Sequence, residues 1–97
     1  MFKKIFLFFR EKYLHRKLIA ALPYFETNPE KAYQVACDIL PKSSFNSLLQ
    51  AGCYDFMASY WREKNDFEEA VAYLKKAISI YRILPNEYYE FATALTE

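Results

Sequence analysis

The scarcity of turn-forming residues is the feature that most constrains the fold of this chain. Its 97 residues include 1 Gly and 4 Pro. Tight β-hairpin turns usually need Gly or Asn at positions with positive φ, so few such hairpins can form. Long helices joined by short turns need far fewer residues of this kind. The sequence therefore predicts an all-α protein, and its length suits a single domain covering residues 1–97.

Two amphipathic helices are predicted between residues 44 and 84. In the first helix, apolar residues recur at steps of three and four, which is the spacing of one helix face. These residues are Phe45, Leu48, Leu49, Cys53, Phe56, Met57, Tyr60 and Trp61. Ser43 or Ser44 is the predicted N-cap. The helix is predicted to end near Lys64, because Asn65 tolerates the left-handed backbone of a helix C-terminus.

The second helix of this pair follows almost at once. Asp66 is a good N-cap residue, and Glu69 stands three positions later, which is the pattern of a capping box. The predicted apolar face stops before Pro85 and consists of Phe67, Ala70, Val71, Leu74, Ala77, Ile78 and Tyr81. Since only one or two residues separate the two helices, they are predicted to fold back on each other as an antiparallel pair.

Two shorter helices are predicted on either side of this pair. Residues 28–40 have Asn28 as an N-cap and Pro29 at the first helical position, and Pro41 ends the segment. Residues 86–97 form a predicted C-terminal flanking helix. Its apolar positions are Tyr88, Phe91, Ala92 and Leu95.

The N-terminal segment, residues 1–22, is predicted to be a basic, aromatic amphipathic helix that Pro23 ends or kinks. One stripe at helical spacing consists of Phe2, Ile5, Phe6, Phe9 and Tyr13, while Leu7, Phe8 and Leu14 lie on the opposite side. The first two turns are therefore apolar all round, which predicts that they are buried on two sides. Residues 1–17 contain six Lys and Arg residues and one Glu, which gives a net charge of +5. Since the whole chain has a net charge of +1, the remaining residues carry −4. This asymmetry indicates either an interaction through the arm or a solvated helix end.

Residues 51–84 resemble a tetratricopeptide repeat, a helical hairpin of about 34 residues with aromatic and small residues at characteristic positions. The matching residues of the first helix are Tyr54, Met57, Ala58 and Trp61, and those of the second are Phe67, Ala70, Leu74 and Ala77. Small Ala58 and Ala70 let the two helices approach closely. A degenerate copy precedes it in residues 28–40, with Pro23 standing where a Tyr is expected. The resemblance implies about 1.5–2 repeats.

The number of repeats bears on the predicted function. Such repeats need about three neighbours to bury a continuous core. Either the flanking helices act as caps, or a partner completes the stack. The 9 Tyr, 9 Phe and 1 Trp exceed what so small a body can bury, which predicts an exposed apolar patch. The resemblance and this patch together predict a non-catalytic protein-interaction module, such as an adaptor, a chaperone or an accessory subunit of a larger assembly.

The inward positions of the hairpin's first helix are the predicted partner-binding residues. These are Gly52, Asp55, Phe56, Ser59 and Arg62. Some members of the family clamp a peptide carboxylate with Lys, Arg and Asn at such positions. That basic clamp is missing here, so the predicted partner is an apolar helix or an extended segment. Alternatively, Phe56 belongs to the core and the other side chains are solvated.

The second candidate function is a peripheral membrane protein anchored by its N-terminal helix. The predicted contacts with an anionic membrane or a larger assembly are Phe2, Lys3, Lys4, Ile5, Phe6, Phe8, Phe9 and Arg10. No uncharged apolar run approaches the roughly 20 residues of a spanning helix, and no cleavable signal is expected. The predicted location is cytoplasmic or at the inner face of a membrane. Import into an organelle and assembly with further copies of the chain stay open.

No catalytic, cofactor or metal site is predicted. The chain has 1 His and lacks both a Gly-rich phosphate loop and an HExxH motif. Cys37 and Cys53 form no CxxC pair, and His15, which is expected to be solvated, is the only other soft ligand. Both cysteines are predicted to be buried thiols rather than a disulfide. The pI of about 7.7 lacks the basic excess of a nucleic-acid-binding protein.

Overall fold

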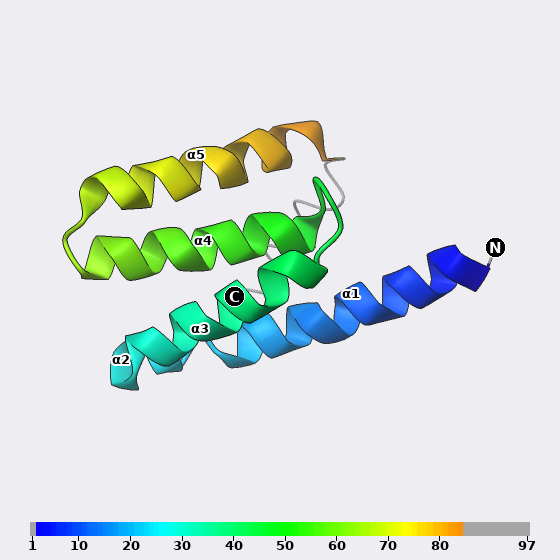
Figure 1. Ribbon diagram of the computed structural model, residues 1–97, viewed down its shortest axis with the longest axis horizontal. Helices are drawn as coiled ribbons and strands as arrows, with labels where there is room; N and C mark the ends of the chain where they lie inside the picture. Colours follow the sequence, from blue (N-terminus) through cyan, green and yellow to red (C-terminus); the bar gives the residue numbers. More distant parts are fainter. Residues whose placement is uncertain (1, 85–97) are drawn as a thin grey trace.

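The computed structural model describes residues 2–84, with side chains described from residue 10 onward (Figure 1). Every regular element in this range is helical, which confirms the predicted all-α class. The elements are α1 (Phe2–Ala20), α2 (Tyr24–Thr27), α3 (Pro29–Ile39), the 3₁₀ turn η1 (Leu40–Lys42), α4 (Leu48–Glu63) and α5 (Phe67–Ile83). The flanking helix predicted at residues 86–97 lies outside the described residues.

The start of α3 follows the predicted capping pattern. The Asn28 side chain accepts a hydrogen bond from the backbone N–H of Lys31 at 3.3 Å, and Pro29 occupies the first position. Pro needs no hydrogen-bond partner there, because first-turn N–H groups have none within the helix. Before it, Pro23 has helical dihedrals and leads into α2, a one-turn helix that the sequence did not predict.

The start of α4 differs from the prediction. Ser47, rather than Ser43 or Ser44, is the N-cap and accepts a hydrogen bond from the N–H of Gln50 at 3.1 Å. Asn46, with φ of 56°, turns the chain just before this cap. Phe45 therefore lies outside the helix and is 85% exposed, although its spacing placed it on the apolar face.

The connection between α4 and α5 is a tight left-handed turn at Asn65. This residue has φ of 64°, as predicted for the end of the helix. Its N–H donates to Arg62 O at 3.0 Å, and the N–H of Asp66 donates to Trp61 O at 2.9 Å. This pair of bonds is a Schellman motif, which satisfies two of the carbonyls in the last turn of α4. Asp66 then caps α5 by accepting from the N–H of Glu69 at 3.2 Å.

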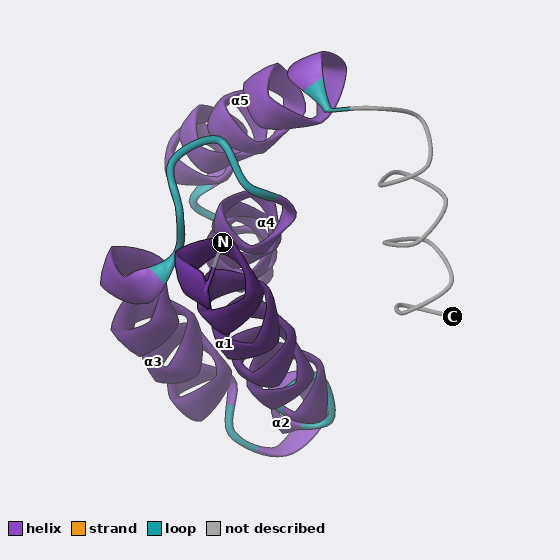
Figure 2. Ribbon diagram, turned by 90° about the vertical axis from the view of Figure 1, so that its right-hand side faces the viewer, coloured by secondary structure: helices purple, strands orange, loops and turns teal. Residues whose placement is uncertain are grey.

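The helices form two antiparallel pairs, α1 with α3 and α4 with α5 (Figure 1). Helix α4 lies in the middle, with α5 on one side and both α1 and α3 on the other (Figure 2). At one end, Lys64 Nζ lies 2.6 Å from Glu30 Oε1, which links the α4–α5 turn to the start of α3. Each half of the described chain is therefore a helical hairpin, and α4 joins the two halves.

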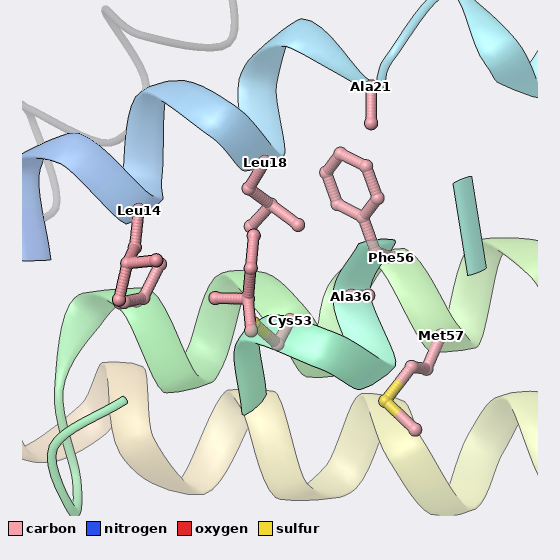
Figure 3. Packing of buried hydrophobic residues seen from close by; sticks show 9 residues of the cluster. Leu14, Leu18, Ala21, Ala36, Cys53, Phe56 and Met57 are labelled. Carbon is pink, nitrogen blue, oxygen red and sulfur yellow. The ribbon is translucent and has the colours of Figure 1, made fainter. Parts of the chain in front are cut away.

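The core lies where α1, α3 and α4 meet (Figure 3). Its buried residues are Leu14, Leu18 and Ala21 of the first segment, Ala36 and Ile39 of α3, and Leu49, Cys53, Phe56 and Met57 of α4. Burying a large apolar side chain stabilises the fold by roughly 1.5–3 kcal/mol. Leu14 is buried, whereas its neighbour Tyr13 is 63% exposed. At this level α1 is buried on one side. The two-sided burial was predicted for the first two turns of the helix, whose side chains lie outside the described residues.

Candidate functional site

The outer side of α5 carries a row of exposed apolar side chains. Phe67, Val71, Leu74 and Ile78 follow one another at steps of four, three and four, so they share one helix face. Their exposed fractions are 60%, 47%, 43% and 40%, respectively. We refer to these four residues as the α5 stripe. The sequence placed them on the packed face of the helix, and the structure corrects that assignment.

The face of α5 that does pack on α4 is narrower than the apolar pattern suggested. Ala70, Ala77 and Ile80 are buried in it. Within residues 2–84, α5 packs mainly on α4 and buries the part of its circumference that faces this helix, so the adjoining apolar residues are exposed. Ala58 of α4 is buried at 7% exposure and Ala70 at 8%, which agrees with the predicted close approach of the two helices.

Two of the five predicted partner-binding residues lie in the core region instead of on an open surface. A Cβ at Gly52 would lie 3.2 Å from Leu18 Cδ2, so α1 covers this position. Phe56 is 7% exposed, and its ring centroid lies 5.2 Å from that of Phe25. Phe56 is therefore a core residue, as the alternative interpretation of the sequence predicted. The inner side of α4 at these two residues is occupied by the chain itself.

The other three predicted residues, Asp55, Ser59 and Arg62, follow one another at helical spacing along α4. Ser59 is half-buried and Arg62 is exposed. Asp55 is half-buried, and its Oδ2 accepts a hydrogen bond from the Tyr81 hydroxyl at 2.7 Å. Tyr81 stands three residues after Ile78 in α5. The hydrogen bond therefore brings this side of α4 next to the α5 stripe. We refer to Asp55, Ser59 and Arg62 together with the α5 stripe as the end face.

The carboxyl group of Asp55 is the electrostatically unusual member of the end face. Burial raises its pKa above the ordinary value, and the hydrogen bond from Tyr81 opposes this rise only in part. A half-buried carboxylate that carries a desolvation cost is a frequent feature of binding sites. In sequence, Asp55 is one of two acidic residues of α4. Its desolvation could not be recognised without knowing that the fold buries this side of the helix.

A cluster of aromatic rings fills the junction of α3, α4 and α5. The Tyr33 ring stacks on Tyr60 at 4.4 Å and meets Trp61 edge-on at 5.8 Å between centroids. Tyr54 and Tyr73 stack at 6.2 Å across α4 and α5. Burial raises the pKa of Tyr33 to about 12, so its hydroxyl stays protonated. The contacts of Tyr33 with Tyr60 and Trp61 join the two helical hairpins, whereas the Tyr54–Tyr73 stack lies within the second hairpin.

The groups with potential for chemistry are dispersed. Cys37 and Cys53 are free thiols, and burial raises the pKa of Cys53 to about 12, which keeps it protonated and poorly nucleophilic. His15 is half-buried rather than solvated, and burial lowers its pKa. It lies near Gly52, with its Cε1 3.9 Å from where a Cβ would stand. In residues 10–84, no three His, Cys, Asp or Glu side chains converge as a metal site would require.

The outer side of α1 is basic. Its exposed side chains are Arg10, Lys12, Tyr13, Arg16 and Lys17, which we call the α1 outer face. Among the contacts predicted for a membrane or an assembly, Arg10 is the one with a described side chain, and it is exposed. Phe2, Lys3, Lys4, Ile5, Phe6, Phe8 and Phe9 belong to α1 by their backbone, but their side chains are outside the description.

These observations define the class of protein as a small all-α protein with two distinct exposed surfaces, the end face and the α1 outer face. No protein-family model, no curated protein and no solved structure matches this chain. None of the helices within residues 2–84 combines the length and the hydropathy needed to cross a bilayer.

Proposed function

We propose that this protein is a non-catalytic interaction module with tetratricopeptide-like architecture, serving as an adaptor, a chaperone or an accessory subunit of a larger assembly. The observation that carries the proposal is the α5 stripe, in which four large apolar side chains stand in one row, each at least 40% exposed. Contiguous apolar surface that is rimmed by polar residues marks a site where another chain binds.

The arrangement of the two hairpins supports this proposal. In helical repeat proteins, each hairpin buries its apolar outer side against the next one. Here α4 packs on both helices of the preceding pair, while α5 packs on α4. The α5 stripe therefore lies where a further helix would continue the stack. A helix supplied by a partner would bury these side chains as a next repeat does.

The residues around the stripe favour one kind of partner. Lys75 and Arg82 follow Val71 and Ile78 by four positions, so they border the stripe on its solvent side, and both are exposed. Arg62 adds a third exposed cation at the end face. The occupant proposed here is an amphipathic helix of another protein, with an apolar row against the stripe and acidic residues along its edge.

The proposal can be tested with a stripe variant and a matched control. Leu74→Lys with Ile78→Lys places two charges within the stripe, whereas Ala72→Lys with Ser79→Lys places them at exposed positions elsewhere on α5. Circular dichroism must first show that both variants keep the helicity of the native protein. We expect the native and control proteins to co-purify with the same partner from cells that express the chain naturally, and the stripe variant to lose it.

Two results would contradict the proposal. Equal recovery of the partner with the stripe variant and the control would show that the end face is not used. Recovery of no partner with the native protein, at physiological salt, would leave the stripe without its proposed occupant. Sedimentation of the purified chain adds a third outcome, because dimerisation that the stripe variant abolishes would identify a second copy as the occupant in place of a different protein.

A further inference from the structure

The α1 outer face has a fixed orientation relative to the body of the protein. Leu14, Leu18 and Ala21 are buried against the rest of the molecule, with exposed fractions of 5%, 1% and 0% (Figure 3). The five side chains of the outer face lie on the other side of the helix, in solvent. Four of them are cationic, and the fifth, Tyr13, is 63% exposed. This part of α1 therefore presents a positive surface without any reorganisation of the fold.

The acidic residue nearest to this surface is turned away from it. Glu11 Oε1 accepts a hydrogen bond from the backbone N–H of Ser44 at 2.8 Å, so its carboxylate is directed toward the loop before α4. His15 faces α4, near Gly52, and adds nothing to the outer face. Since neither group neutralises the four cations, an anionic ligand would meet their full charge.

The charge of the whole chain reinforces this local surface. The first 17 residues carry a net charge of +5 and the remaining residues −4. In an electric field that extends from a negative surface, such a distribution turns the N-terminal helix toward the surface and the rest away from it. The N-terminal part of α1 also extends beyond the other described helices, where it is accessible to a flat surface (Figure 1).

We infer that the α1 outer face binds an anionic lipid surface, with α1 lying parallel to the membrane. This interaction goes beyond the proposed protein-binding function and uses a different side of the molecule. Two features favour lipid over other anions. The surface is one side of a single helix of 19 residues, Tyr13 lies among the cations, and Tyr is enriched at the level of lipid headgroups. Proteins that bind single-stranded nucleic acids instead combine a basic groove with aromatic side chains on which successive bases stack.

The test is co-sedimentation of the full chain with lipid vesicles. One set contains phosphatidylcholine alone and the other includes about 30% phosphatidylserine, at about 0.1 M salt. We expect binding to the anionic vesicles, little binding to the neutral ones, and marked weakening at about 0.5 M salt. Lys12→Gln with Arg16→Gln is expected to weaken binding about 30-fold, since each cation near an anionic surface contributes roughly fivefold.

The matched control is Lys64→Gln with Lys76→Gln, which removes two exposed cations outside α1 and is expected to change binding by less than about twofold. Circular dichroism verifies that both variants are folded. Failure to bind anionic vesicles, equal binding to neutral ones, or an equal loss in the control would each overturn the inference. Tighter binding to a single-stranded oligonucleotide than to the vesicles, lost in the Lys12→Gln, Arg16→Gln variant, would replace lipid by nucleic acid. The α5 stripe variants separate this result from the protein-binding proposal, because they leave α1 intact.

Discussion

Gly52 of α4 and Leu18 of α1 are in direct contact, since a Cβ added at position 52 would lie 3.2 Å from Leu18 Cδ2. Leu18 is 1% exposed and has little space into which it could move. The only glycine of the chain therefore sits inside a helix, where glycine costs about 1 kcal/mol relative to alanine. The close approach of α1 explains why a small residue stands there despite this cost.

This contact predicts the effect of a large side chain at position 52. Gly52→Leu is expected to lower the free energy of unfolding by about 2 kcal/mol, because the added atoms overlap the buried Leu18. Leu18→Ala opens space for them, so the double variant is expected to be more stable than the sum of the two single effects. Urea denaturation of all four proteins measures this coupling. Purely additive losses would show that α1 does not rest on α4 at Gly52.

A second prediction concerns the pH dependence of stability through Asp55. The folded protein has a raised pKa at this carboxyl because of burial, so it holds the proton more tightly than the unfolded chain does. The stability associated with the neutral form is complete below the unfolded pKa and is lost as the pH rises through the folded pKa. At pH 7 the ionised group thus destabilises the fold. Asp55→Asn removes this charge and can still accept the hydrogen bond from Tyr81.

We therefore expect Asp55→Asn to melt at a higher temperature than the native protein at pH 7, with the difference disappearing below about pH 4. Asp38→Asn is a suitable control, because this residue is exposed and its carboxylate accepts a bond only from Gln34 among the described side chains. The control should change the melting temperature little at either pH. A lower melting temperature for Asp55→Asn at neutral pH would refute the prediction.

A third prediction tests the contact between α4 and α5. Ala70 is 8% exposed and lies at the closely packed side of α5, so Ala70→Arg forces a charge into the helix pair. We expect a loss of about 3 kcal/mol or more, enough to unfold much of a domain of this size. Ala72→Arg, at an exposed position of the same helix, should cost less than about 0.5 kcal/mol. Helicity by circular dichroism and thermal melting distinguish the two.

A fourth prediction concerns the left-handed turn at Asn65, whose φ is 64°. A β-branched residue is strained in this conformation, so Asn65→Val is expected to destabilise the protein by about 1–2 kcal/mol. Asn65→Gly should be tolerated, because glycine adopts positive φ without steric cost. Chemical denaturation gives both values. If the Asn65→Val and Asn65→Gly proteins were equally stable, the backbone at position 65 could not be left-handed.

The helical class and most helix ends could be predicted from the sequence because they depend on local chemistry. Asn28 with Pro29, Asp66 with Glu69, and the left-handed Asn65 all act through backbone groups within a few residues. Such short-range hydrogen bonds are readable from residue type and order. The start of α4 was misplaced because three serines near it are equally good caps, and only the turn at Asn46 selects Ser47.

The surfaces were harder to predict, since they depend on which helix lies against which. The apolar residues of α5 form a continuous arc in sequence, but among the described helices α4 covers only part of this arc, and Leu74 and Ile78 are exposed. In the same way, Gly52 and Phe56 have the spacing of groove residues in the sequence. In the structure, α1 covers Gly52 and α2 contacts Phe56. Asp55 and Tyr81 are 26 residues apart in the chain, and only the folded hairpin joins them.

Trp61 gives the junction of the two hairpins an intrinsic optical reporter. It is the only tryptophan of the chain, its ring lies 5.8 Å from that of Tyr33 of α3, and its indole nitrogen is buried. An indole shielded from water emits at a shorter wavelength, and water entering between α3 and α4 shifts the emission to the red. Separation of the hairpins can therefore be followed by fluorescence in the unmodified protein, independently of events at the α5 stripe or the α1 outer face.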